Sequence, residues 1–325
     1  MKAIVQNAYG SPDLLELKSV DKPRVEENEV LVRVHAAALN AGDYFSMEGS
    51  PWLARFSVGF PRPKDYILGW DAAGEVMEVG KDVKGFKPGE AVFGACSHTL
   101  AEYVSAAEDT LACKPVNLAF EQAAAVPTAA LTALQGLRDA GKIQPGQKVL
   151  INGAAGGVGT FAVQISKALG AEVTAVCSTR NVDSMRAIGA AQVVDYTQQD
   201  FTRTGQRYDL ILDNVGNRSF SDCKRALTPE GILVPNTGHA GMGYVIKAAV
   251  RSLFVRQQGK LFLAQPNRAD LEVLKDLIEA GQVMPIIDRT YRLSETAAAL
   301  KYVGEGHVRG KVVITVAEAR QGGTE

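Results

Sequence analysis

Over the first third of the chain, hydrophobic and polar positions alternate in short runs between closely spaced Gly and Pro residues. This pattern predicts β-strands in an antiparallel barrel or sandwich rather than βαβ repeats. The expected strands are Lys2–Val5, Glu29–Ala37, Asp71–Val79, Ala91–Ala95 and Leu100–Ser105.

The pattern changes at residues 120–140, where Ala, Leu and Thr replace the turn residues and the apolar positions take a helical period. Strands and helices are then expected to alternate, which indicates a parallel sheet covered on both faces. The expected strands are Lys148–Asn152, Glu172–Cys177, Gln192–Asp195, Tyr208–Leu212 and Gly231–Pro235, and the expected helices are Val158–Leu169, Val182–Ile188 and Phe220–Leu227.

The alternation ends after Asn236. Residues 238–262 carry Lys247, Arg251, Arg256 and Lys260 among apolar residues and predict a basic amphipathic helix. This helix either packs beside the active-site cleft with a solvated basic face, or contacts a membrane surface or an acidic substrate tail. The remaining expected elements are helices at Ala269–Glu279 and Ser294–Tyr302, and strands near Ile287–Tyr291 and at Gly310–Val316.

A glycine-rich turn joins the expected strand Lys148–Asn152 to the helix that follows it. Because glycine has no Cβ, the backbone of this turn can come close to a pyrophosphate. The N–H groups and the dipole of the helix N-terminus favour binding of such an anion. The turn lies between a strand and a helix, and an alternating sheet follows. In this context a dinucleotide site is preferred over a turn without a ligand. The residues expected to bind are Gly153, Ala155, Gly156, Gly157, Val158 and Gly159.

The residues that follow the expected strand Glu172–Cys177 indicate which dinucleotide is bound. An NAD site places a carboxylate there for the ribose 2′-hydroxyl, whereas this chain has Ser178, Thr179 and Arg180. Hydroxyls and a guanidinium suit a 2′-phosphate, so NADP(H) is the expected cofactor. Arg180 has an alternative interpretation as a surface cation at a helix start. The other expected contacts lie after strand ends, at Tyr196, Asn214, Val215, Gly216, Asn236, Thr237 and Gly238.

Composition narrows the function classes. The 325 residues include 35 Lys and Arg against 36 Asp and Glu, so a general basic surface for nucleic acid is not expected. The four cysteines are far apart and form no C-x-x-C pair, which argues against a zinc knuckle or a disulfide framework. The first residues lack a signal or transit pattern and no apolar run is long enough for a membrane span, so a cytoplasmic location is expected.

Four segments together resemble the medium-chain dehydrogenase/reductase superfamily, and most of all its quinone oxidoreductases and alkenal/enone reductases. The resemblance implies a Rossmann domain that binds the nucleotide, inserted into a partly open, GroES-like β-barrel catalytic domain built from both chain ends. The implied boundaries are 1–119 and 263–325 for the catalytic domain and 120–262 for the Rossmann domain, and the implied assembly is a homodimer. The segments that carry the resemblance are Leu68–Gly94, Ala123–Leu137, Val149–Thr179 and Ile287–Ile314.

The resemblance also places Asn40, Trp70 and Thr128 where the zinc-dependent branch has its metal ligands. None of the three is a usual zinc ligand, so no metal is expected. Without a Lewis acid, reduction of an unactivated carbonyl is difficult, whereas a conjugated quinone or enone accepts hydride at an electron-poor carbon. The expected partner is therefore a small quinone or α,β-unsaturated carbonyl.

Catalytic candidates follow from the N-x-x-D signature of the zinc-free branch. Asn40 is expected to face the nicotinamide and substrate, and Asp43 either acts in catalysis or caps the local backbone. Tyr44 either donates a proton to the developing enolate or forms a pocket wall.

Three further residues match positions near the cofactor. Thr128 and Thr132 are expected near the nicotinamide, although threonines at a helix start also serve structure. Lys311 resembles a basic residue that contacts phosphate, with an ordinary lysine at a strand edge as the alternative.

The leading hypothesis is thus a zinc-independent NADPH-dependent reductase of quinones or enones. One alternative is an enoyl-thioester reductase that receives an acidic carrier on its basic segment. The other is an NADPH-binding sensor with weak catalysis, because a fold does not establish an activity.

Overall fold

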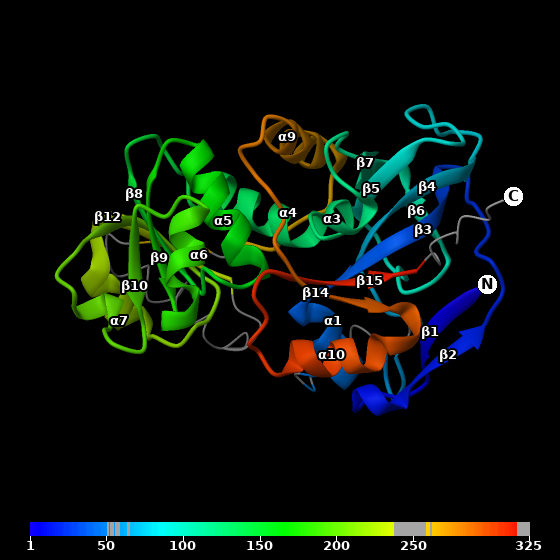
Figure 1. Cartoon of the computed structure of the whole chain (residues 1–325), viewed down its shortest axis with the longest axis horizontal. Coiled ribbons are helices and arrows are strands. Elements are labelled where there is room, and N and C mark those ends of the chain that lie inside the picture. The colour runs from blue at the N-terminus through cyan, green and yellow to red at the C-terminus, as the bar shows by residue number, and fades with distance from the viewer. Residues whose placement is uncertain are drawn as a thin grey trace, which may run out of the picture.

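Two sheets organise the chain in the computed structural model, which describes residues 1–50, 52, 55, 59–63, 66–236, 258–260 and 262–316. Figure 1 shows the green and yellow middle of the chain around one sheet, and the blue and red chain ends together around the other. The sequence predicted a Rossmann-like α/β domain and a second, β-rich domain, and both are confirmed. The predicted domain boundaries stay predictions.

The first sheet is parallel, in the order β10-β9-β8-β11-β12-β13. Its central strand β8 is a run of fully buried Val149, Leu150 and Ile151, as expected of a strand covered on both faces. The strands are β8 (Lys148–Asn152), β9 (Glu172–Cys177), β10 (Gln192–Asp195), β11 (Tyr208–Asp213), β12 (Leu227–Pro235) and β13 (Gln258–Gly259).

The second sheet has the order β14-β15-β3-β4-β5-β7, with β6 also pairing with β3. It is antiparallel except for the pair β14 and β15. Its strands are β3 (Glu29–Leu39), β4 (Asp71–Val79), β5 (Ala91–Ala95), β6 (Tyr103–Ala107), β7 (Leu111–Cys113), β14 (Ile287–Arg292) and β15 (Lys311–Thr315), and a separate hairpin pairs β1 (Lys2–Gln6) with β2 (Leu15–Ser19).

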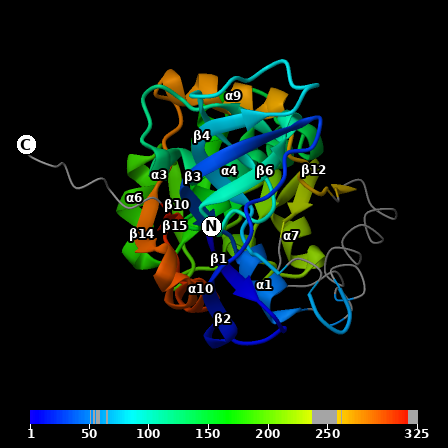
Figure 2. The same cartoon turned by 90° about the vertical axis from the view of Figure 1, so that its right-hand side faces the viewer.

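Helices cover both sheets. Figure 2 faces the second sheet and shows α9 along one edge and α1 with α10 on the opposite side. Pro127 interrupts the long helix predicted over residues 120–140, because a proline without an N–H begins α4 after α3 has ended. The helices are α1 (Ala41–Glu48), α3 (Phe120–Ala124), α4 (Pro127–Gln135), α5 (Gly157–Ala168), α6 (Val182–Ala187), α7 (Phe220–Ala226), α9 (Arg268–Glu279) and α10 (Thr296–Gly304).

Among the described α-helices and β-strands, four were missed by the sequence analysis, namely α1, β2, β7 and β13. The first of these matters most, because α1 begins directly after Asn40 and carries Asp43 and Tyr44. The predicted basic helix at residues 238–262 falls mostly outside the described residues, and its end is wrong, because Gln258 and Gly259 form β13 beside β12. Thr237 and Gly238 also fall outside the described residues. None of the described helices combines the length and the apolar character that crossing a membrane requires.

Candidate functional site

The glycine-rich turn between β8 and α5 depends on glycine at specific positions. Gly153 has φ +74°, a left-handed conformation that glycine adopts at little cost. A Cβ on Gly159 would lie 2.2 Å from the carbonyl oxygen of Gly153, so α5 packs onto the turn because that atom is absent. A Cβ on Gly156 would meet only the Gly153 oxygen, at 3.6 Å. Space is therefore open beside Gly156.

Backbone donors of α5 border that open space. Gly156 is the N-cap of the helix, and no side chain caps its first N–H groups. Unpaired N–H groups and the positive end of the helix dipole favour an anion at this place. The turn thus fits the pyrophosphate of a dinucleotide in both shape and donors. The other predicted contacts of this turn, Ala155, Gly157 and Val158, lie in the same segment.

The carboxylate of Asp195 lies beside the residues predicted to bind the 2′-phosphate, and the sequence analysis missed it. The Thr179 hydroxyl donates to Asp195 Oδ2 at 2.6 Å, and this hydrogen bond lowers the pKa of Asp195. Thr197 and Gln198 also donate to this carboxylate. The proton of Thr179 is therefore engaged within the protein.

Ser178 and Arg180, which follow β9, still have hydrogen-bond donors available for a ligand. The Ser178 oxygen accepts from the Asn181 amide at 3.2 Å, which leaves its own proton for another acceptor. Arg180 is exposed and donates from one guanidinium nitrogen to the backbone oxygen of His307 at 3.3 Å. A guanidinium has five N–H donors, so this single bond leaves capacity for a phosphate.

Amide side chains gather at the carboxyl edge of the parallel sheet, where ligands bind in open α/β sheets. Asn236, after β12, donates to Asn214 Oδ1 at 2.8 Å, and Asn214 donates to the Asn152 carbonyl at 3.1 Å. The backbone N–H groups of Val215 and Gly216 both donate to Asp213 Oδ1. The structure therefore brings these predicted residues to one edge of the sheet. Tyr196, also predicted, is 55% exposed after β10.

A buried polar cluster joins four chain segments at Asn40. The Asn40 amide nitrogen donates to Asp71 Oδ2 at 2.9 Å, and its oxygen accepts from the Lys311 ammonium at 2.5 Å. Lys311 also lies 3.1 Å from Asp71 Oδ2, and the two side chains are 2% and 0% exposed. The backbone N–H of Thr128, in the first turn of α4, donates to Asp71 Oδ1 at 2.8 Å. Asp71 is the member of this cluster that the sequence analysis did not identify.

The two predicted threonines of α4 have different roles in the structure. Thr128 enters the cluster through its backbone, where the Asp71 carboxylate satisfies a free N–H of the helix start. The Thr132 hydroxyl donates to the Thr128 carbonyl at 2.7 Å, one helical turn earlier. This contact favours the structural interpretation for Thr132.

Asp43 caps α1 from inside the protein. Its carboxylate accepts from the backbone N–H of Asn40 at 2.7 Å, and its other oxygen is buried without a hydrogen-bond partner. Burial raises the pKa of Asp43 to about 7, against the lowering effect of the Asn40 bond. The capping role is thus observed, and the raised pKa means that the carboxylate form is less favoured here than in an exposed aspartate.

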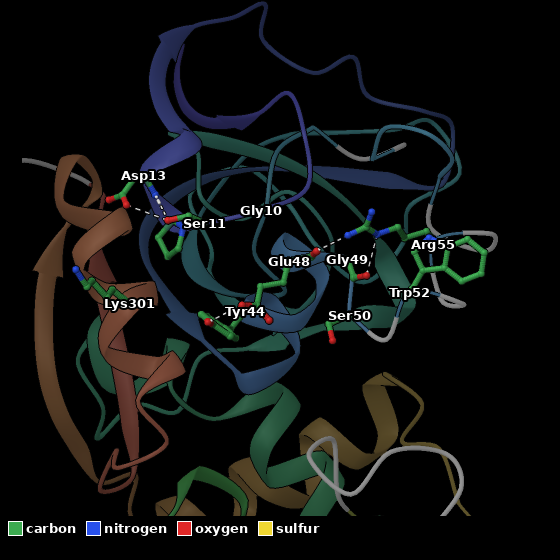
Figure 3. Close-up of a pocket in the computed structure, with 11 residues that line it drawn as sticks. Gly10, Ser11, Asp13, Tyr44, Glu48, Gly49, Ser50, Trp52, Arg55 and Lys301 are labelled. Atoms are coloured by element: carbon green, nitrogen blue, oxygen red, sulfur yellow. Dashed lines mark hydrogen bonds between the residues drawn. The ribbon is translucent and has the colours of Figure 1, made fainter.

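The Tyr44 hydroxyl has its hydrogen-bond partner outside the cluster of Asn40, Asp71 and Lys311. It donates to Glu48 at 2.7 Å, and this bond raises the pKa of the phenol. Both residues line a cavity of about 610 Å³. Figure 3 shows Lys301 of α10 on one side of them and Arg55 on the other. A phenol with a raised pKa is a weaker proton donor, so the wall interpretation of Tyr44 is favoured.

Comparison with known proteins identifies the family. One family model, described as an alcohol dehydrogenase GroES-like domain, matches residues 26–162, and another, described as a zinc-binding dehydrogenase, matches residues 188–314. A 2-methylene-furan-3-one reductase of Solanum lycopersicum is 33% identical over 97% of this chain and 79% of its own length. The chain belongs to the medium-chain dehydrogenase/reductase superfamily.

Other members of the superfamily agree with this assignment. An NADPH-dependent alkenal/one oxidoreductase of Arabidopsis thaliana is 32% identical over 97% of this chain and 79% of that protein. The solved structure of a quinone oxidoreductase from Coxiella burnetii superposes with a TM-score of 0.87 at 35% identity, covering 98% of this chain and 99% of the other. The predicted superfamily is confirmed, and this medium-chain dehydrogenase/reductase is an oxidoreductase of an NAD(P)-dependent family.

Two of the positions that the resemblance assigns to metal ligands of the zinc-dependent branch have other contacts in this chain. Asn40 is bound by Asp71 and Lys311, and the ring of Trp70 covers Gly42, whose Cβ would lie 2.0 Å from it. Within the described part of the chain, no group of three or more His, Cys, Asp or Glu residues is placed to hold a metal ion. The absence of a metal stays a prediction.

Proposed function

We propose that the protein is a zinc-independent, NADPH-dependent reductase that transfers hydride to quinones or α,β-unsaturated carbonyls. The observation that carries this proposal is the Asn40 amide, held by Asp71 and Lys311 at a position that the resemblance assigns to a metal ligand. A fixed amide donor suits a substrate that needs a hydrogen bond at its oxygen rather than a Lewis acid.

The cofactor would be held by two groups of residues. The turn around Gly156 and the first N–H groups of α5 would bind the pyrophosphate. Ser178 and Arg180 would bind the 2′-phosphate, with Asp195 keeping Thr179 in place. NADPH, when bound there, supplies the hydride.

The proposed substrate class follows from the hydrogen-bond donor that the Asn40 amide provides. Hydride addition to a conjugated carbon moves negative charge onto the carbonyl oxygen, and a nearby N–H donor stabilises that charge. The names of the relatives, which include an alkenal/one oxidoreductase and a quinone oxidoreductase, support the same substrate class.

Turnover by the purified protein tests the proposal. Loss of NADPH absorbance would be followed with a naphthoquinone, a medium-chain enone and an enoyl thioester, with NADH as the alternative cofactor. Gly156→Asp is the matched control, because a carboxylate at the open position opposes a pyrophosphate. Activity on the quinone or enone above this control is expected, and its absence would overturn the proposal.

Two other outcomes identify the competing functions. A strong preference for the thioester would favour an enoyl-thioester reductase. Tight NADPH binding, measured by cofactor fluorescence, without turnover of any acceptor would favour a sensor protein.

A further inference from the structure

We propose that Lys311 and Asp71 are positioning residues that orient and polarise the Asn40 amide, so that its second N–H donates to the carbonyl oxygen of the substrate. This inference rests on the proposed function for its substrate. It assigns Lys311 a role other than contact with a cofactor phosphate.

The orientation of the Asn40 amide is fixed by two opposite charges. Its nitrogen faces the Asp71 carboxylate at 2.9 Å and its oxygen faces the Lys311 ammonium at 2.5 Å. If the amide turned by 180°, its NH₂ group would meet the ammonium and its oxygen would meet the carboxylate. Both contacts would be repulsive, so the charges select one orientation.

The charged pair is itself held rigidly. Asp71 is 0% exposed and accepts hydrogen bonds from Asn40, Lys311 and the Thr128 backbone, which belong to three separate segments. Lys311 is 2% exposed at the first residue of β15. In such a buried setting, electrostatic interactions are stronger than at the surface. The amide is therefore oriented before any ligand arrives.

An asparagine amide has two N–H donors, and Asp71 takes one of them. Asn40 is half-buried rather than enclosed, so a ligand can approach this residue from the solvent side. The Lys311 bond withdraws electron density from the amide oxygen and makes the second N–H a stronger donor. A preorganised donor of this kind stabilises charge that develops on a substrate oxygen.

The same contacts oppose a phosphate role for Lys311. Two of its three N–H donors are already engaged, one by Asn40 and one by Asp71. Moving it to a phosphate would leave the buried Asp71 carboxylate without its cation, which is costly. The positioning role and the phosphate role predict different effects on cofactor binding.

Four variants separate these roles. Lys311→Met removes the polarising charge, and Lys311→Arg keeps it. Asp71→Asn combined with Lys311→Met removes both charges together and so avoids a lone buried carboxylate. Lys87→Met is the control, because its side chain is 80% exposed in a loop.

Kinetics and cofactor affinity give the first readout. We expect kcat on an enone or quinone to fall about tenfold to a hundredfold in the two variants that carry Lys311→Met, with Lys311→Arg retaining most of it. The Kd for NADPH, from cofactor fluorescence, should stay within about threefold of wild type. If the Kd rises in step with the loss of kcat, or if the folded double variant keeps wild-type kcat, the inference is wrong.

Binding of an anionic probe gives a readout that does not depend on turnover. The NADP⁺-loaded protein should bind p-nitrophenolate, whose oxygen carries the charge of an enolate, about tenfold tighter than the double variant does. Equal affinity of both proteins would overturn the inference. A wild-type protein that binds the probe in this way but reduces no acceptor would overturn the proposed function alone.

Discussion

The backbone N–H of Gly310 donates to the carbonyl oxygen of Ala155 at 2.9 Å, which joins the segment before β15 to the glycine-rich turn. Gly310 has φ +85°, and a Cβ there would lie 2.3 Å from the Ile286 oxygen, so the contact depends on glycine. The next residue is Lys311, whose ammonium binds Asn40. The turn that fits a pyrophosphate and the amide that would face the substrate are thus held by one short segment.

Two glycines of the turn should respond differently to the same substitution. In Gly156→Ala the new Cβ meets only one atom, at 3.6 Å, and the backbone at φ −81° suits any residue, so the fold should keep its melting temperature. The Cβ would occupy the space proposed for the pyrophosphate, so the Kd for NADPH should rise about tenfold or more.

Gly159→Ala is the contrasting variant, because its Cβ would lie 2.2 Å from the Gly153 oxygen. It should lower the melting temperature by several degrees, consistent with about 1–3 kcal/mol of overpacking. Thermal unfolding and fluorescence titration of both proteins provide the check. An unstable Gly156→Ala protein, or one with wild-type NADPH affinity, would contradict this account of the turn.

Local signals account for the elements that the sequence predicted well. The apolar strand β8 and the glycines after it are contiguous in the chain, and periodicity with turn residues describes such a unit. The short helix α1 was missed because its Ala-Gly-Asp start has the composition of a turn.

Contacts between distant residues could not be predicted from local patterns. Asn40 and Lys311 were each identified singly, yet 271 positions separate them, and only the pairing of β15 with β3 brings them together. The sequence gives one indication that Asp71 is functional, because it is a lone carboxylate at the start of the run Ala72–Gly74. Its hydrogen-bond partners are 31, 57 and 240 positions away in the chain. Asp195 meets Thr179 across two neighbouring strands, which only the sheet order reveals.

Arg180 should determine the preference between the two dinucleotides. Replacing it with Gln removes the exposed guanidinium proposed to bind the 2′-phosphate, and the Kd for NADPH should rise about tenfold to a hundredfold. The Kd for NADH, which lacks this phosphate, should stay unchanged. Arg186→Gln on α6 is the control, since Arg186 contacts only the exposed Asp183 among the ion pairs of the described residues. An equal loss of affinity for both cofactors would assign Arg180 to structure instead.

Tyr44 should prove dispensable for proton transfer. Its hydroxyl donates to Glu48 in the cavity between α1 and α10, and that bond raises its pKa. In Tyr44→Phe the ring remains against Gly304, so kcat/KM should stay within about threefold of wild type. Asn40→Ala is the comparison, with an expected loss of about a hundredfold. A loss of that size in Tyr44→Phe would restore the proton-donor hypothesis for this residue.

Asp43 should make the free energy of unfolding depend on pH in a defined window. Burial raises its pKa from 3.8 to about 7 in the folded protein, so between these values the folded state holds a proton that the unfolded state has released. The Asp43 contribution therefore favours unfolding progressively as pH rises from about 4 to about 7, by an amount on the order of 4 kcal/mol. Asp43→Asn keeps an oxygen for the Asn40 N–H but cannot ionise, so its stability relative to wild type should increase across this window.

Urea unfolding of both proteins at a series of pH values from 4.5 to 8 would measure this difference. The pH-dependent contributions of the carboxylates that both proteins share cancel in this comparison. Asp183→Asn serves as the control, because the Asp183 side chain is 98% exposed. A stability difference between Asp43→Asn and wild type that does not change with pH would show that Asp43 ionises normally despite its burial. The unpartnered oxygen of Asp43 would then have to be hydrated, because only a water or another donor stabilises a buried carboxylate to that extent.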